Sequence, residues 1–491
     1  MTSFNRPHPD NFGFCFDNSY SRLPEVLFAQ QPPKRFSSPS LVMFNHDLAT
    51  ALGLNVAELE SNDWAVFSGA SLPEGACPIA QAYAGHQFGY FSHLGDGRAI
   101  LLGEHVAPDQ ARVDIQLKGS GPTHYSRSGD GLAALGPMLR EYLVSEAMHA
   151  LGVPTTRSLA VMLTGELVYR NKALSGAVLT RVAASHIRVG TFQYAASIDD
   201  KNALKALADY TIDRHFPALK QQANPSLGLL NAVIDGQANL IATWMALGFI
   251  HGVMNTDNMS ISGETIDYGP CAFMNTYHPK TVFSSIDKEE RYAFGNQPMI
   301  GQWNLTRFAE SLLPLIDEDQ PTAIKLAVEC LDHYPDKFRA AWLNAMRKKI
   351  GLFGAEVSDL SLIEDLLMLM YKYRADYTNT FRNLNNPSEV NAELSNSEEF
   401  KIWLKQWNER LSRQAQSSED VMQLMDAHNP AVIPRNHLVE EALISAEAGD
   451  MQPFHALMEV LLEPYAHPKN ERYRLPPESN YDESYMTFCG T

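Results

Sequence analysis

The distribution of apolar and polar residues predicts a strand-rich first part of the chain. Three runs between residues 85 and 118, GHQFGYF, RAILLGE and RVDIQLKG, are typical of strands, and a turn, SHLGDG, separates the first two. In RVDIQLKG the apolar and polar residues alternate strictly. Two further strand-like runs, SLAVMLTG and GAVLTRVA, extend this pattern to about residue 185.

Helical spacing of apolar residues predicts a mainly helical second part. One helix, PMLREYLVSEAMHAL, already interrupts the strands, between Pro137 and Gly152. Beyond the strands, residues 229–247, 355–416 and 437–463 have helical spacing. Strands followed by helices indicate an α+β fold with a bilobal outline.

Composition and charge exclude several partners. The chain has 491 residues and a formal net charge of −18, which argues against general binding to nucleic acids or anionic membranes. No apolar run approaches the roughly 18 residues that a membrane-spanning helix needs. The N-terminus lacks the basic start and apolar run of a secretory signal, so we expect a cytoplasmic protein. A few local arginines could still bind a small anion.

The cysteines do not form a metal-binding motif. They are scattered along the chain without a C-x-x-C pair, so a zinc site is not expected. Reduced thiols are the simplest interpretation. The five positions are Cys15, Cys77, Cys271, Cys330 and Cys489.

The stretch HGVMNTDN, residues 251–258, is similar to a protein-kinase catalytic loop that differs at its key position. Kinases have H-R-D-x-x-x-x-N there, and the Asp accepts the proton of the substrate hydroxyl. His251 and Asn258 keep this spacing, but Val253 stands in place of the Asp. By itself the match has three interpretations: a chance similarity, an inactive kinase, or a kinase-like site that catalyses another reaction.

The residues after this loop predict a hairpin that pairs two metal ligands. Ser262 and Gly263 suit a two-residue turn, which would place Asn258 opposite Asp267. Directly opposed residues have Cβ atoms roughly 5 Å apart on one face of the ribbon. An amide oxygen beside a carboxylate suits Mg²⁺, and kinases use such a pair. An ordinary surface hairpin is the alternative.

Charged residues in the same region could complete a phosphate site. Lys118 lies on the polar face of its strand, although a solvated edge lysine is the alternative. A kinase lysine is oriented by a helix glutamate, and the next helix offers Glu141 and Glu146. A helical wheel places Glu146 in the apolar stripe and Glu141 nearly opposite, so the pattern does not choose between them. Arg181 and Arg188 would share a face if their segment were helical.

Two glycine-containing stretches could approach a phosphate. In HLGDGR, Gly95 and Gly97 would let backbone N–H groups approach an anion, with Arg98 beside them. The second stretch contains Asp130 and Gly131. Taken alone, HLGDGR favours a plain hairpin turn, because Ile100 stands where G-x-G-x-x-G has its third glycine, and the second stretch is equally ambiguous.

Taken together, these motifs closely resemble the selenoprotein O family. The resemblance rests on DIQLKGSGPT, GDGLAALGPMLREYLVSEAMHALG, HGVMNTDNMSI with IDYGP, and the terminal CGT, and it covers nearly the whole chain. It implies a bilobal protein-kinase-like fold, with a nucleotide-binding N-lobe over residues 1–190. Residues 191–491 would form a C-lobe with the metal motifs and a cysteine-containing tail.

The resemblance also implies an activity. Members of the family transfer AMP from ATP, bound in a flipped orientation, to hydroxyl side chains of proteins and release pyrophosphate. UMP transfer from UTP is also attributed to the family, and the metal is Mg²⁺ or Mn²⁺. The expected partners are therefore ATP or UTP and hydroxyl-bearing proteins. We expect the chain to be a monomer.

Individual roles follow from motif position in the family. Asp257 looks like the catalytic base, Asn258 and Asp267 look like the metal ligands, and Lys118 and Glu141 look like the kinase-type ion pair. The positions that the resemblance assigns to the nucleotide are Gly95, Gly97, Arg98, Lys118, Asp130, Gly131, Arg181, Arg188 and Asp267.

The family further implies a redox link between Cys271 and the tail residue Cys489.

Two other functions remain open: a γ-phosphate kinase of a small molecule or protein, and a nucleotide-binding pseudokinase scaffold. Val253 argues against a kinase, which keeps an Asp at that position. The presence of Lys118, Asn258 and Asp267 argues against a scaffold, because degenerate scaffolds commonly lose some of these residues.

Overall fold

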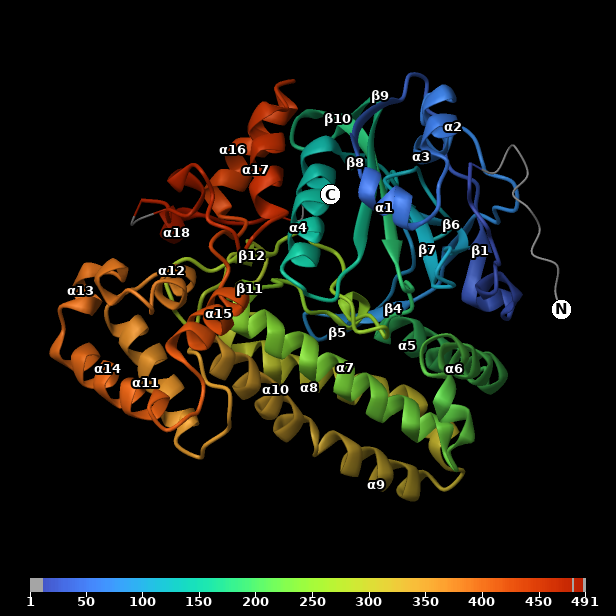
Figure 1. Ribbon diagram of the computed structural model, residues 1–491. Coiled ribbons are helices and arrows are strands. Elements are labelled where there is room, and N and C mark those ends of the chain that lie inside the picture. The colour runs from blue at the N-terminus through green and yellow to red at the C-terminus, as the bar shows by residue number, and fades with distance from the viewer. Residues whose placement is uncertain (1–11, 479–480, 489–491) are drawn as a thin grey trace.

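The computed structural model describes residues 12–478 and 481–488. Its first part contains an eight-stranded sheet in the order β1-β3-β6-β7-β10-β9-β2, with β8 beside β10, and all the pairs are antiparallel (Figure 1). The strands of this sheet are β1 (Phe28–Gln30), β2 (Ser40–Phe44), β3 (Ile79–Gln81), β6 (Ala99–Val106), β7 (Arg112–Lys118), β8 (Ala133–Ala134), β9 (Arg157–Tyr169) and β10 (Ala173–Ala183).

The run GHQFGYF forms a separate hairpin outside the main sheet. Its strands β4 (Ala84–Gln87) and β5 (Tyr90–His93) pair with each other. Phe88 and Gly89 make the turn, and both have positive φ angles, 50° and 89°. This backbone conformation favours glycine and is uncommon for phenylalanine.

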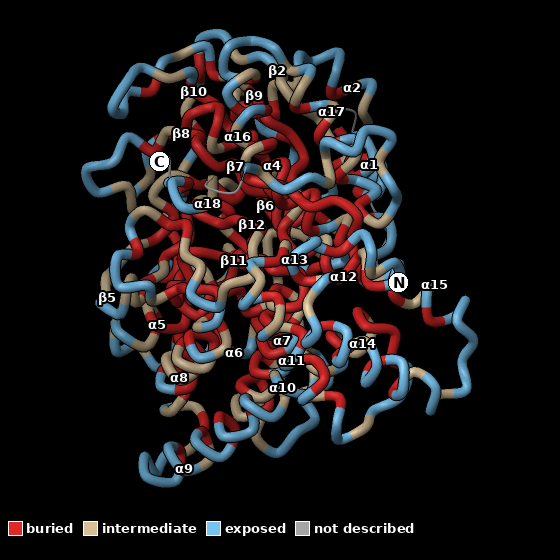
Figure 2. The backbone as a smooth tube through the Cα atoms, turned by 90° about the vertical axis from the view of Figure 1, so that its left-hand side faces the viewer, coloured by how far each residue is buried: buried red, intermediate tan, exposed pale blue. Residues whose placement is uncertain are grey.

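Helix α4 (Leu135–Ala150) is the helix expected between the strands, and it is buried on almost every side. It packs against β9 and β10, and helices α16 (Asn436–Glu447) and α17 (Gln452–Leu461) near the C-terminus cover it as well. In Figure 2 the buried part of the chain is concentrated around this contact. Since apolar neighbours surround α4, its sequence lacks a clear polar face.

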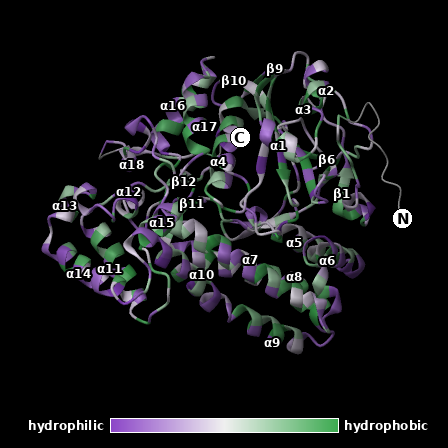
Figure 3. Cartoon of the chain, in the orientation of Figure 1, coloured by the Kyte–Doolittle hydropathy of each residue, from purple (hydrophilic) through white to green (hydrophobic). Residues whose placement is uncertain are grey.

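The second part is mainly helical, as the sequence predicts. Its central helix α7 (Pro225–Leu247) ends at Gly248, whose φ of 73° caps the helix in the left-handed region. Helices α8 (Gln297–Ile316) and α10 (Tyr334–Lys349) pack against α7. Polar residues lie on the outer helices of this part in Figure 3. The fold is α+β with a strand-rich N-terminal part, in agreement with the kinase-like architecture.

The remaining elements complete the architecture. They are α1 (His46–Ala51), α2 (Val56–Ser61), α3 (Ala65–Ser68), α5 (Val189–Ser197), α6 (Lys201–His215), β11 (Phe249–Ile250), β12 (Ala272–Phe273), α9 (Gln320–Leu331), α11 (Asp359–Lys372), α12 (Tyr377–Arg382), α13 (Ala392–Ser395), α14 (Glu398–Leu411), α15 (Ser418–His428) and α18 (Tyr481–Ser484). Within the described residues, no helix has both the length and the apolar character required to cross a lipid bilayer.

The prediction of a hairpin between Asn258 and Asp267 is wrong, because the two arms do not pair with each other as strands. A turn closes where it was expected, with the N–H of Gly263 donating to the carbonyl of Ser260 at 3.3 Å. The two arms then pair with other segments instead of with each other. Ile261 donates to the carbonyl of Ile187, and residue 265 donates to the carbonyl of residue 154. The arms are therefore pinned to the N-terminal part.

The expectation that Arg181 and Arg188 share a helix face is also wrong. Arg181 lies in β10, and Arg188 is the extended residue that precedes α5. The strand places one arginine beside β7, and the following loop brings the other to the catalytic-loop segment. They nevertheless reach the same carboxylate, as described below.

Candidate active site

A cleft of about 1400 Å³ lies where the sheet, helix α4 and the loop after β11 meet. It contains every nucleotide and metal position expected from the sequence. Those lining residues are Gly95, Gly97, Arg98, Lys118, Asp130, Gly131, Glu141, Arg181, Arg188, Asp257, Asn258 and Asp267.

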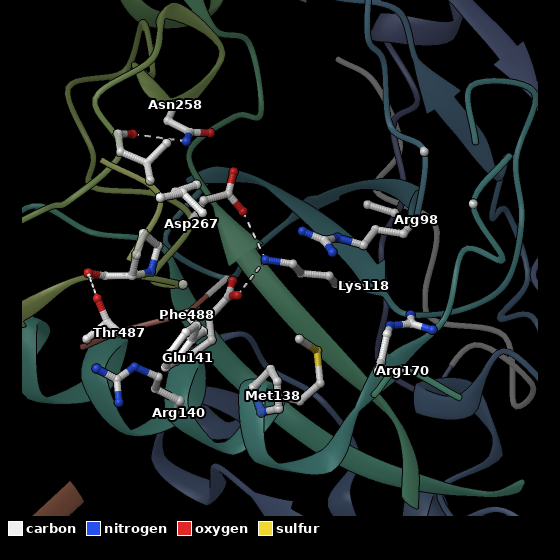
Figure 4. A pocket seen from close by; sticks show the side chains of 18 of the residues that line it. Arg98, Lys118, Met138, Arg140, Glu141, Arg170, Asn258, Asp267, Thr487 and Phe488 are labelled. Atoms are coloured by element: carbon white, nitrogen blue, oxygen red, sulfur yellow. Dashed lines mark hydrogen bonds and ion pairs between the residues drawn. The ribbon is translucent and has the colours of Figure 1, made fainter. Parts of the chain in front are cut away.

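Lys118, the last residue of β7, lies between two carboxylates at the inner wall of the cleft (Figure 4). Its Nζ donates to Glu141 Oε2 at 2.6 Å and to Asp267 Oδ1 at 3.0 Å. The structure thus brings Lys118 to Glu141. Glu146 instead accepts hydrogen bonds from Arg157 at 2.7 Å and from Asn45 at 2.7 Å.

Asp267 is surrounded by three cationic side chains. Besides Lys118, Arg181 donates to Oδ1 at 2.6 Å and Arg188 donates to Oδ2 at 2.9 Å. Burial would raise the pKa of Asp267, but the three cations together hold it well below its usual range. The backbone of Asp267 has a φ of 64°, which is uncommon outside glycine and turns this carboxylate toward the cations.

Asp257 is buried in a short 3-10 turn, Thr256–Asn258. Its Oδ2 accepts a hydrogen bond from Gln87 at 3.3 Å, and its Oδ1 has no hydrogen-bond partner among the described residues. Burial raises the pKa of Asp257 to about 6, against the opposing effect of Arg188. Oδ1 is enclosed within the protein, whereas the residue as a whole lines the cleft. A raised pKa in a cleft is typical of a group that accepts protons.

Strand β4 forms the wall that covers Asp257. A Cβ atom on Gly85 would lie 2.6 Å from Asp257 Oδ1, so only glycine allows this approach. The N–H of His86 donates to Thr256 Oγ1 at 2.7 Å, and the N–H of Phe88 donates to Asn255 Oδ1 at 3.1 Å. The β4–β5 hairpin is therefore fastened to the catalytic-loop segment.

Asn258 is held so that its amide oxygen is available. Its Nδ2 donates to the carbonyl of Val253 at 3.0 Å, which leaves Oδ1 for another partner. In the part of the chain that the structure describes, no group of three or more His, Cys, Asp or Glu side chains could hold a metal ion. A divalent ion here would need Asp267, Asn258 and ligands from outside the protein, a donor set of oxygens that suits Mg²⁺.

The glycines of HLGDGR pack against a neighbouring loop. A Cβ on Gly95, whose φ is 103°, would lie 2.4 Å from the ring of Tyr125, and one on Gly97 would lie 3.1 Å from the Tyr125 carbonyl. Asp96 stands between these two glycines, and burial raises its pKa to about 6. Arg98 extends into the cleft beside this turn (Figure 4).

Asp130 and Gly131 form part of the cleft rim, together with a residue that the sequence did not indicate. Arg170, which directly follows β9, donates to both carboxylate oxygens of Asp130 at 2.8 and 3.1 Å, and to the carbonyl of Leu132 at 3.0 Å. Gly131 has a φ of 67° and touches the backbone of Gly121 so closely that no side chain fits. Arg170 therefore fixes the conformation of this rim.

Sequence reasoning also missed Gly85 and Gln87. An isolated glycine within a strand pattern can mark a close backbone approach, and that feature of GHQFGYF pointed to the contact with Asp257. Nothing local to the sequence indicated the role of Arg170, because its partner lies 40 residues earlier in the chain.

Cys271 lies behind the cleft, and it is a free thiol in the structure. Burial raises its thiol pKa to about 12, and its carbonyl accepts from Arg140 at 2.8 Å. The C-terminal segment passes nearby, where Thr487 Oγ1 donates to the carbonyl of Pro270 at 2.7 Å. Cys489 lies outside the described residues, so the expected pair stays a prediction.

Comparison with known families identifies the group to which the chain belongs. The family described as "Protein adenylyltransferase SelO" matches residues 12–462. The chain is a member of the SelO family. As a SelO-family protein it is a nucleotidyltransferase.

Three bacterial relatives named "Protein nucleotidyltransferase YdiU" match this SelO-family chain over almost its full length. The protein of Geobacillus kaustophilus is 59% identical over 98% of this chain and 99% of its own. That of Shouchella clausii is 57% identical over 97% and 98%, and that of Halalkalibacterium halodurans is 57% identical over 98% of each chain.

Proposed function

We propose that this protein transfers AMP from ATP to serine, threonine or tyrosine hydroxyls of other proteins. The observation that carries the proposal is the arrangement of Asp257 and Asp267. One is a buried carboxylate with a free oxygen, and the other is a carboxylate held by Lys118, Arg181 and Arg188 in the same cleft. A proton acceptor beside a cationic phosphate site is what nucleotidyl transfer requires.

Asn258 and Asp267 are the residues that would hold a divalent ion, Mg²⁺ or Mn²⁺. The donor set is one amide oxygen and one carboxylate, so phosphate oxygens and water would complete it. When bound, such an ion neutralises charge on the phosphates and orients them. Asp267 is kept ionised by its three cations, as a metal ligand must be.

The cations deep in the cleft support a flipped nucleotide. Lys118, Arg181 and Arg188 are buried, whereas Arg98 and the rim of Asp130 lie nearer the opening. In our proposal the terminal phosphates occupy the region of Arg98, Lys118 and Arg181. The α-phosphorus then faces Asp257, in place of the γ-phosphorus that faces the catalytic Asp of a kinase.

The proposed reaction is a displacement at the α-phosphorus. The acceptor hydroxyl oxygen forms a bond to that phosphorus, and its proton passes to Asp257. The bond between the α-phosphorus and the bridging oxygen breaks, and pyrophosphate leaves with the electron pair. Lys118 and Arg181 offset the charge that develops on the phosphates, and Glu141 holds Lys118 in place.

Several finer points remain predictions. UTP could replace ATP, because no residue that we assign contacts a base. A regulatory disulfide between Cys271 and Cys489, a monomeric state, a cytoplasmic location and the lobe boundary near residue 190 are expectations from the sequence. A γ-phosphate kinase has no specific support, since Val253 is an apolar residue that lines the cleft.

Labelled ATP tests the proposal. The protein is incubated with Mg²⁺, an acceptor mixture and ATP labelled at either the α- or the γ-phosphate, and protein-bound label is followed. We expect retention of the α-label alone, with the γ-label in pyrophosphate. Retention of the γ-label would make the protein a kinase, and retention of neither would indicate a nucleotide-binding scaffold.

A further inference from the structure

The β4–β5 hairpin has one face turned toward Asp257. In its register Gly85 is opposite Ser92 and Gln87 is opposite Tyr90, so these four side-chain positions share a face. Gly85 touches the carboxylate of Asp257, and Gln87 donates a hydrogen bond to it. Tyr90 therefore stands on the same face as the proposed catalytic base, next to the residue that contacts it.

Tyr90 is unusually exposed for a large aromatic residue. It is 80% exposed, and all the other residues of β5 are at least partly exposed. On the opposite face of the hairpin the aromatic rings contact one another: Phe91 contacts His86 at a ring distance of 5.2 Å, and His86 contacts Trp303 at 5.3 Å, although Phe91 remains 42% exposed. Thus the face beside Asp257 carries an aromatic ring that packs little against the protein itself.

The hairpin face that carries Gln87 and Tyr90 borders the cleft on the side of Asp257. Gln87, Phe88 and Asp257 all line the cleft, and hydrogen bonds join Gln87 to Asp257 and Phe88 to Asn255. Tyr90 lies just outside this lining, directly opposite Gln87. Gly85 closes the Oδ1 side of Asp257 and Gln87 contacts Oδ2, so we place the acceptor hydroxyl at Oδ2, next to Gln87. The rest of the acceptor chain then lies over the hairpin face.

We propose that Tyr90 binds the acceptor protein, by packing against an apolar or aromatic side chain close to the modified hydroxyl. This inference rests on the proposed function and names the part of the site that selects the acceptor. The Cβ atoms of the opposed residues Gln87 and Tyr90 are about 5 Å apart, and a tyrosine ring extends about 5 Å further. In an extended acceptor segment, the side chain that contacts Tyr90 is therefore about three residues from the modified hydroxyl. Tyrosine is a favoured anchor in such interfaces.

Peptide acceptors test this inference. The probe is a pool of peptides, each with one central serine, threonine or tyrosine and randomised flanks without other hydroxyl residues, incubated with α-labelled ATP and Mg²⁺. For wild type we expect labelled peptides enriched in apolar or aromatic residues within about three positions of the hydroxyl. For the best peptide, Tyr90→Ala is expected to lower kcat/KM about tenfold, through KM for the peptide and with KM for ATP unchanged.

The controls separate this inference from the proposed function. Tyr90→Phe keeps the ring and should retain peptide KM, and Tyr371→Ala removes a 44% exposed tyrosine on α11 and should behave as wild type. If wild type labels no peptide or protein, the proposed function fails. If wild type labels peptides and Tyr90→Ala labels them with the same KM and sequence preference, only the inference about Tyr90 is overturned.

Discussion

Asp257 and Asp267 are joined by a single nitrogen atom. Nη1 of Arg188 donates to the main-chain oxygen of Asp257 at 2.8 Å and to Oδ2 of Asp267 at 2.9 Å. The guanidinium lies over the ring of Tyr83, with its carbon 4.7 Å from the ring centroid. The proposed base and the proposed metal ligand are thus positioned by one side chain, which precedes α5.

Arg188→Lys should reduce nucleotidyl transfer although it keeps the positive charge. A lysine ammonium lacks the planar guanidinium that stacks on Tyr83 and so holds Nη1 between the two aspartates. We expect kcat/KM to fall about 10- to 100-fold, as for the loss of a hydrogen bond to a charged group. Initial rates with α-labelled ATP measure the effect, and a rate equal to that of wild type would exclude the bridging role.

Asp267→Asn should abolish transfer and destabilise the fold. The neutral amide leaves Lys118 and Arg181 with Glu141 as their hydrogen-bonded carboxylate, and it removes the carboxylate that accepts from Arg188. Breaking a buried charge cluster in this way lowers the free energy of unfolding by about 3 kcal/mol. Denaturant unfolding monitors the loss. Asp130→Asn is the matched control, because the Asp130–Arg170 pair is partly exposed and its loss should cost less than about 1 kcal/mol.

Glu141→Gln and Glu146→Gln should separate a site residue from a structural residue on one helix. Glu141 orients Lys118, so its neutral variant should lose transfer activity even at a permissive temperature where the variant is folded. Glu146 pairs with Arg157 and does not line the cleft, so its variant should lose thermal stability and keep kcat at a permissive temperature. Equal losses of activity in both variants would contradict the assignment of Glu141.

The thermal stability of the protein should depend on pH through Glu264. Burial raises the pKa of this carboxyl from 4.5 to about 7, although Ser262 and the N–H of Ala184 donate hydrogen bonds to it. Its protonation therefore stabilises the folded state fully below about pH 4.5, and this stabilisation is lost as the pH rises through about 7.

Glu264→Gln should remove this pH dependence. The Tm of the variant minus that of wild type should be at least about 2 °C larger at pH 8 than at pH 5. Thermal melts of both proteins at the two pH values give the comparison. A constant difference in Tm across this range would show that Glu264 does not titrate there.

The sequence predicted the strands around Lys118 well, because RVDIQLKG alternates and lies between a turn and a glycine-rich stretch. It did not predict the contacts of the 258–267 segment, where an isolated hairpin was the simplest interpretation. The structure instead pairs each arm with a segment distant in sequence, near residues 154 and 187. Long-range pairing of this kind leaves no mark on local spacing.

Local sequence spacing also could not decide between Glu141 and Glu146 as the partner of Lys118. The helical wheel assumes that one face of a helix is buried, but α4 is enclosed by β9 and β10 and by α16 and α17. When a helix is buried on nearly all sides, the apolar stripe no longer tells which glutamate faces the cleft. Family resemblance, rather than periodicity, indicated Glu141.

Single-turnover transfer by Asp257→Asn tests the central claim most directly. The asparagine keeps the size of the side chain and an oxygen for the bond from Gln87, but it cannot accept the hydroxyl proton. With saturating α-labelled ATP and Mg²⁺, we expect the transfer rate to fall about 1,000-fold while the dissociation constant for ATP changes less than about threefold. A transfer rate close to that of wild type would contradict the assignment of Asp257 as the base.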